Sequence, residues 1–178
     1  MPKRLLTRWT GFGTLANGAK RRTIAYWLNI CALPTNMPNN KIVLDTNCLL
    51  ACISSKSENF RVWKDFQAGR IVLCVSNEIL EEYQEIISQK ANPIVAENVV
   101  NAIVESEFVE LVDPQFHLDL ITADRDDNKF VDCAFAANAV FIVSDDSHFD
   151  ILKEVSFPQL LVLKLKEFLA VLQRDTLI

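Results

Sequence analysis

From residue 41 onward, short apolar runs rich in β-branched residues alternate with segments of helical periodicity, and this alternation limits the fold more than any other feature. The apolar runs cover residues 41–45, 71–75, 108–112, 139–144 and 160–164. Four of them are almost continuously hydrophobic, which is typical of strands in a parallel sheet covered on both faces. Strand–helix alternation favours right-handed crossovers. The sequence therefore predicts an α/β fold with three layers, α/β/α.

Capping residues place the helices between these strands. Ser57 is a predicted N-cap and Gly69 a predicted stop for one helix. Ser76 is predicted to cap a second helix over residues 77–90, with an apolar stripe centred on Tyr83. Further helices are expected over residues 93–104, 126–138 and 166–173, the middle one with Asp126 as its N-cap.

Length and composition fit one folded domain in a reducing compartment. The chain has 178 residues, and half of them are hydrophobic, so it can bury a core without disulfides. Its five cysteines, an odd number, include no C-x-x-C pair, and Cys48 and Cys52 are expected to be buried thiols. No apolar run approaches the 18 or so residues of a membrane span. We therefore expect a cytoplasmic protein without a membrane partner.

Charge divides the chain in two. Residues 1–40 hold six basic residues and no acid, whereas residues 41–178 hold 12 basic and 23 acidic residues, a net charge of −11. The basic extension, residues 1–40, could be a targeting peptide, a disordered tail or an upstream start, and we favour the last because Met37 lies just before the first strand. An acidic domain over residues 41–178 should repel nucleic acids unless its carboxylates hold cations.

Acidic residues follow two of the predicted strands. Asp45 follows the first strand, and Asp145 and Asp146 follow the fourth. Turn formation alone could explain each of them. In parallel α/β sheets, however, functional groups gather at the carboxyl ends of the strands. Glu82 adds a third acid, because it is the glutamate of its helix that lies nearest the boundary between core and solvent.

A fourth acid comes from the helix expected over residues 126–138. Asp127 shares the side of Phe130 and Ala134, whereas Asp132 projects from the far side. Four carboxylates at one edge repel one another, by about 4 kcal/mol per pair at 4 Å and an effective dielectric of 20. Either some carry raised pKa values or a cation lies among them. Oxygen ligands alone select Mg²⁺ or Mn²⁺, and such ions activate water against phosphodiesters.

Four motifs in order resemble the PIN domain, most closely the toxins of prokaryotic toxin–antitoxin systems. They are Ile42-Val43-Leu44-Asp45-Thr46-Asn47, Ser76 to Tyr83, Asp126 to Ala134 and Ile142 to Phe149. The resemblance covers residues 41–172. It implies a five-stranded parallel sheet and a Mg²⁺- or Mn²⁺-dependent endoribonuclease that cuts RNA and is restrained by a cognate antitoxin. A homodimer is also compatible with the sequence.

The resemblance also assigns the site. Asp45, Glu82, Asp127 and Asp146 match the catalytic, metal-binding acids of the family. Supporting positions are Asn47, two residues after the first acid, and Ser144, where threonine is usual, with Asp132 and Asp150 as reserve ligands.

Two other functions stay open. A haloacid-dehalogenase-type phosphatase also joins a strand-ending aspartate to a late Asp-Asp pair, but its chemistry needs an acid where this chain has Asn47. A catalytically inactive PIN-like binding module would keep the fold, and the four retained acids argue against it. His148 is interpreted as a solvated loop residue and His117 as one without a motif.

Overall fold

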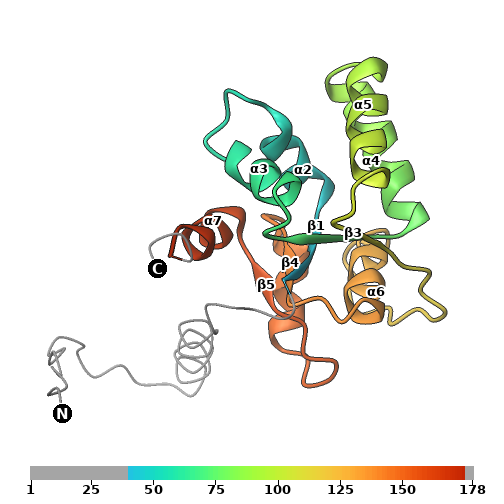
Figure 1. Ribbon diagram of the computed structural model, residues 1–178. Coiled ribbons are helices and arrows are strands. Elements are labelled where there is room, and N and C mark those ends of the chain that lie inside the picture. The colour runs from blue at the N-terminus through green and yellow to red at the C-terminus, as the bar shows by residue number, and fades with distance from the viewer. Residues whose placement is uncertain (1–39, 175–178) are drawn as a thin grey trace, which may run out of the picture. The chain divides into compact units, whose positions relative to one another are not determined.

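A computed structural model describes residues 40–174 of the chain (Figure 1). Their strands form one sheet, in the order β3-β2-β1-β4-β5, and every neighbouring pair is parallel. The strands are β1 Lys41–Leu44, β2 Val72–Val75, β3 Val109–Leu111, β4 Phe141–Val143 and β5 Val162–Leu163. All five predicted strands are therefore present, and the five-stranded parallel sheet is confirmed.

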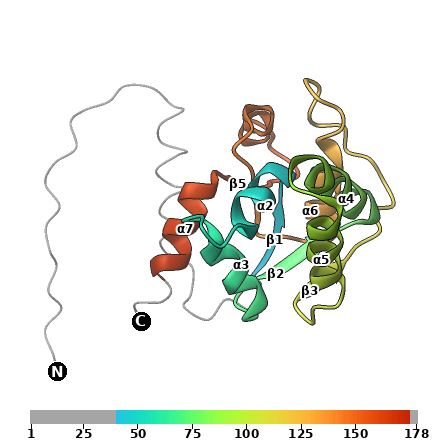
Figure 2. The same ribbon diagram turned by 90° about the horizontal axis from the view of Figure 1, so that it is seen from above.

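Helices flank this sheet. They are α2 Thr46–Ile53, α3 Phe60–Gln67, α4 Asn77–Lys90, α5 Pro93–Val104, α6 Asn128–Ala136, α7 Leu165–Arg174 and the 3₁₀ helix η1 Ser147–Lys153. Seen from above, α3 and α7 lie to one side of the strands and α4, α5 and α6 to the other (Figure 2). The helix α6 packs on β1, β2 and β4, and α4 packs on α5 and α6. This arrangement gives the three layers predicted from the sequence.

Several caps act as the sequence predicts. The Ser76 side chain accepts a hydrogen bond from the Ile79 backbone N–H, 3.3 Å away, and opens α4. The helix α5 begins at Pro93, as predicted, behind an Asn92 cap. Gly69 follows α3 with a φ of 72°, and a Cβ there would lie 2.5 Å from the Phe108 ring. Glycine is thus required at this stop by both backbone and packing.

Two helix starts differ from the prediction. The helix α3 begins at Phe60 after an Asn59 cap, because Ser57 instead accepts a hydrogen bond from the Asn59 N–H in the preceding turn. The helix α6 begins at Asn128 with Asp127 in the N-cap position, not Asp126. The Asp126 carboxylate does not cap the helix, because it pairs with the Lys129 ammonium group instead.

Two short helices follow the acids at the strand ends and were not predicted. The helix α2 starts directly after Asp45, and the 3₁₀ helix η1 starts directly after Asp146. Each aspartate caps its helix, since its side chain accepts the backbone N–H two residues further on. The only exposed residue of α2 is Asn47. This helix therefore lacks the alternation of apolar and polar faces by which an amphipathic helix is recognised in a sequence.

The sheet is the centre of the core. Ile42, Val43 and Leu44 of β1 are at most 3% exposed, and the β4 residues are similarly buried. Tyr83 of α4 is fully buried and donates its hydroxyl to the Leu44 carbonyl, which fixes α4 to β1. Cys48, Cys52, Cys74 and Cys133 are buried free thiols, as expected for the first two.

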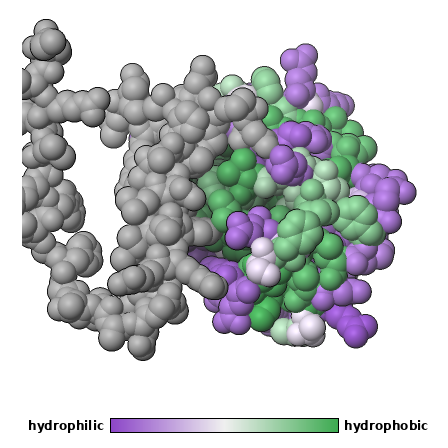
Figure 3. Space-filling model, turned by 90° about the horizontal axis from the view of Figure 1, so that it is seen from below, coloured by the Kyte–Doolittle hydropathy of each residue, from purple (hydrophilic) through white to green (hydrophobic). Residues whose placement is uncertain are grey.

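Some apolar side chains stay at the surface. The underside of the molecule shows hydrophobic residues among hydrophilic ones (Figure 3).

No helix among the described residues is long and apolar enough to cross a membrane. The predicted basic extension lies outside the described residues, apart from Asn40.

Candidate active site

Two acids leave adjacent parallel strands at the same edge of the sheet. In the β1–β4 pair Leu44 stands opposite Val143, so Asp45 and Asp146 emerge on the same side. Ser144 joins them, because its hydroxyl donates to Asp45 Oδ2 at 2.9 Å and accepts the Asp146 N–H at 3.0 Å. The next acid, Asp145, is exposed and instead accepts the Leu165 N–H at the start of α7.

Asp45 is a buried carboxylate, with 5% of the residue exposed. Burial raises its pKa, hydrogen bonds from Ser144 and Asn47 oppose the rise, and the charges of Glu82 and Asp146 add to it. Within residues 40–174, Asp45 forms no ion pair with a lysine, arginine or histidine. A buried negative charge with only neutral donors around it favours either a proton or a bound cation.

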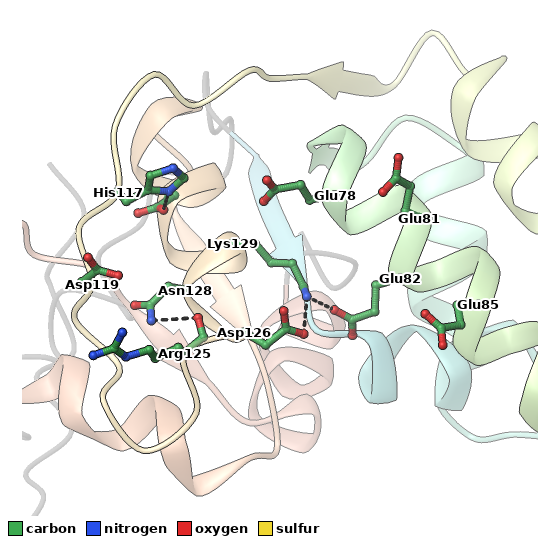
Figure 4. A pocket seen from close by; sticks show the side chains of 11 residues that line it. Glu78, Glu81, Glu82, Glu85, His117, Asp119, Arg125, Asp126, Asn128 and Lys129 are labelled. Atoms are coloured by element: carbon green, nitrogen blue, oxygen red, sulfur yellow. Dashed lines mark hydrogen bonds and ion pairs between the residues drawn. The ribbon is translucent and has the colours of Figure 1, made fainter.

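Glu82 approaches Asp45 from α4 but is occupied by other groups. Its Oε1 accepts the Thr46 hydroxyl, and its buried Oε2 lies 2.7 Å from Lys129 Nζ. Lys129 also pairs with Asp126, and its side chain is only 11% exposed (Figure 4). Burial alone would lower the pKa of Lys129, but these carboxylates outweigh it and hold the pKa above its ordinary value. The ammonium group therefore stays charged and balances Glu82.

Asp127 reaches the same edge from the start of α6. Its Oδ2 lies 3.2 Å from His148 Nδ1, which is also 3.5 Å from Asp146 Oδ1. Burial raises the pKa of Asp127 to about 6, against the His148 hydrogen bond, and the charges of Asp124, Asp146 and Asp45 add to the rise. Asp127 is therefore under electrostatic strain at neutral pH.

The four predicted acids gather at one edge without closing around a single point. The charges of Glu82 and Asp146 raise the pKa of Asp45, and those of Asp45 and Asp146 raise the pKa of Asp127, so the other three acids all lie within electrostatic reach of Asp45. Within the described part of the chain, the one group whose ligand atoms all lie within 4.8 Å of one another is Asp124, Asp127 and His148. The buried Asp45 and the strained Asp127 fit a hard divalent cation.

The supporting residues lie in different places. Ser144 is fully buried between Asp45 and Asp146. Asn47 is exposed and accepts a hydrogen bond from Lys90 Nζ at 2.9 Å. Asp150 pairs with Lys153, and this partner lowers its pKa. Asp150 therefore has a partner of its own on the surface.

Asp132 is held by another part of the chain. It is 2% exposed, because the loop that precedes α6 folds back over it. Its Oδ1 accepts the Leu118 N–H at 2.9 Å, and its Oδ2 lies 3.0 Å from His117 Nδ1. Both carboxylate oxygens of Asp132 therefore hold this loop in place.

An acidic groove of about 480 Å³ runs between α4 and this loop (Figure 4). The α4 side carries Glu78, Glu81, Glu82 and Glu85. Arg125, Asp126 and Lys129 lie on the other side. Lys129 pairs with both Glu82 and Asp126 and thus bridges the two walls of the groove.

Lys129 was not predicted to lie at the site, and His148 was interpreted as a solvated loop residue. Lys129 follows Asp126 by three residues, a spacing typical of an ordinary ion pair on a helix surface. Its second partner, Glu82, comes from α4, which only the tertiary fold brings close. His148 follows Asp146 by two residues, and this spacing was a signal that its ring could reach the acids.

Comparisons with known proteins place these features in a family. A model of the family described as PIN domain matches residues 41–148. A search of curated proteins found no matching sequence. Among solved structures, VapBC2 from Rickettsia felis bound to a DNA fragment from its promoter is similar over 70% of this chain and 98% of that chain, with 17% identity and a TM-score of 0.50.

Two further structures are less similar. DNA-bound VapBC from Salmonella typhimurium matches over 70% of this chain and 98% of that chain, with 17% identity and a TM-score of 0.48. The PIN domain of T. brucei RRP44 matches over 80% of this chain and 87% of that chain, with 18% identity and a TM-score of 0.48.

Proposed function

The chain belongs to the PIN domain family, and from that premise we propose that it is an endoribonuclease dependent on Mg²⁺ or Mn²⁺. The observation that carries this proposal is the buried Asp45 carboxylate, which has no cationic partner among the described residues and shares the Ser144 hydroxyl with Asp146. Asp45, Asp127 and Asp146 would hold the ion, with Glu82 beside them. A bound ion supplies an activated water and neutralises charge on the phosphate.

The chain's own residues arrange this site. Ser144 fixes the spacing of Asp45 and Asp146, and Thr46 together with Lys129 holds Glu82 at the edge of the sheet. His148 stands against Asp127 and Asp146, where its ring can restrain both carboxylates. None of the four cysteines within residues 40–174 takes part as a nucleophile, because burial keeps the pKa values of these thiols high.

We further propose a cytoplasmic toxin with a cognate antitoxin as its protein partner. This part of the proposal rests on the resemblance to toxin PIN domains. The shared fold of VapBC2 is consistent with it. Domain limits of 41–178, with residues 1–40 as an extension, and a homodimer remain predictions. The phosphatase alternative is disfavoured, because the residue two after Asp45 is an exposed asparagine bonded to Lys90.

Two neighbouring aspartates provide the test. Asp146→Asn should abolish Mn²⁺-dependent cleavage of structured RNA. Asp145→Asn should keep it, because Asp145 accepts the Leu165 N–H at the start of α7 and an asparagine oxygen can accept the same bond. Purified protein is incubated with RNA in Mn²⁺ or in chelator, and products are resolved on a gel. Equal cleavage by both variants would refute the mechanism. No RNA cleavage and no Mn²⁺-dependent thermal stabilisation of the parent would favour the inactive binding module.

A further inference from the structure

A second hollow, on the α3 side of the molecule, carries the opposite charge from the rest of the domain. Its volume is about 520 Å³, and we call it the α3 pocket. It is lined by Ser55 and Ser57 of the α2–α3 connection and by the basic residues Arg61, Lys64 and Arg70. Residues 54–70 hold four basic and two acidic residues, whereas residues 41–178 as a whole carry a net charge of −11.

Two of the cations are fixed by one buried carboxylate. Asp65 is 1% exposed, and its Oδ1 accepts Arg70 Nε at 2.8 Å while its Oδ2 accepts Arg61 Nε at 3.3 Å. Arg61 also donates to the Leu172 carbonyl of α7 at 3.0 Å. A single carboxylate therefore holds two guanidinium groups side by side. Such pre-ordered guanidinium groups suit phosphate oxygens.

Lys64 is the third cation of the α3 pocket. It is exposed on α3, and its Nζ lies 5.3 Å from the centre of the Phe60 ring, one turn earlier. No carboxylate among residues 40–174 pairs with it. Lys64 can therefore bind an added anion without first breaking an ion pair.

We propose that the α3 pocket binds a backbone phosphate of the RNA strand, away from the bond that is cut. This inference rests on the proposed function. The two sites are joined by α2, which starts after Asp45 and ends before Ser55, and eight helical residues span about 12 Å. Figure 2 shows α2 and α3 as neighbours. At about 3.4 Å per phosphate in a stacked strand, bridging this distance takes about four phosphates.

This contact would solve a problem that the acids create. A domain with an acidic edge and an acidic groove repels a polyanion, and a bound ion offsets the repulsion only at the site itself. A positive pocket one short helix away adds attraction where no catalytic acid lies. Affinity for the strand would then depend on Lys64, Arg61 and Arg70 as well as on the ion.

The test measures RNA binding separately from cleavage. A labelled single-stranded 12-nucleotide RNA is titrated in chelator at several salt concentrations and followed by fluorescence anisotropy, with the full chain and its Lys64→Gln and Lys166→Gln variants. Lys166 is an exposed lysine on α7 outside the pocket, so it controls for net charge. Lys64→Gln should weaken binding severalfold and reduce the slope of log K against log salt by about 0.7, the value for one contact on a single strand. Lys166→Gln should leave the slope as in the parent.

Equal losses of affinity in the two variants would overturn the pocket, since they would reflect net charge only. If Lys64→Gln weakened the binding of a dinucleotide as much as that of the 12-mer, the idea that one strand spans both sites would be refuted. The proposed function fails on a different result, namely the absence of metal-dependent cleavage. If the protein cuts RNA but Lys64→Gln leaves its RNA affinity unchanged, the proposed nuclease function stands and the role of the α3 pocket is refuted.

Discussion

Replacing Asp127 by asparagine should stabilise the metal-free protein, and the gain should depend on pH. The pKa of Asp127 is raised from 3.8 to about 6 in the folded protein. At 1.36 kcal/mol per pKa unit, this corresponds to an upper limit of about 3 kcal/mol of unfavourable free energy for the ionised form. The Asp127 side chain is 18% exposed, so solvent screens part of it. We expect Asp127→Asn to raise the free energy of unfolding by about 1–2 kcal/mol at pH 8.

The sign follows from proton binding. The unfolded chain loses the Asp127 proton near pH 4, whereas the folded protein keeps it until about pH 6. Between these values the folded state binds more protons, so the free energy of unfolding of the parent falls as pH rises. Asparagine has no such dependence. The gain should therefore be absent below pH 4 and complete above about pH 7.

Urea denaturation in chelator at pH 4 and pH 8 measures the effect, and the gain at pH 8 corresponds to roughly 3–6 °C in Tm. Asp150→Asn is the matched control, because Lys153 lowers the pKa of Asp150 and its removal should bring no gain at pH 8. A loss of stability in Asp127→Asn that is equal at both pH values would refute the idea that burial and neighbouring acids strain this carboxylate.

Three further outcomes are expected. Lys129→Met leaves the largely buried Glu82 without its cation and should cost about 1–3 kcal/mol in chelator, measured by urea denaturation; a more stable variant would contradict this. Tyr83→Phe loses the buried hydrogen bond to the Leu44 carbonyl and should cost about 1–2 kcal/mol in the same assay, and parental stability would show that the bond contributes nothing. Mn²⁺ should raise the Tm of the parent more than that of Asp127→Asn in scanning fluorimetry, and identical rises would place the ion elsewhere.

The strands and most helices could be predicted because their signals are local. The five apolar runs, four of them almost continuous, located all five strands to within two residues. Ser76 and Pro93 marked the starts of α4 and α5 correctly. The start of α6 was wrong by two residues, because Asp126 is drawn to Lys129 rather than to the helix end. The helix α2 was missed because only Asn47 of its residues is exposed.

The candidate site could be predicted only as a set of acids at one edge. Strand ends and helix faces are readable from sequence, and they brought Asp45, Asp146, Glu82 and Asp127 to the same side of the sheet. What holds each carboxylate depends on tertiary contacts between distant elements. The hydrogen bonds of Asp132 to His117 and Leu118 are one example, because nothing in the sequence near Asp132 indicates that this loop packs over it.

The hydrogen bond from Ser144 to Asp45 joins residues 99 positions apart. A ribosome must therefore deliver most of the chain, through β4, before the paired acids can exist at all. Fragments released earlier lack the second acid and cannot assemble the centre. A potentially harmful hydrolytic activity would then arise only after β4 and the residues that follow it have been made, so that synthesis itself delays it.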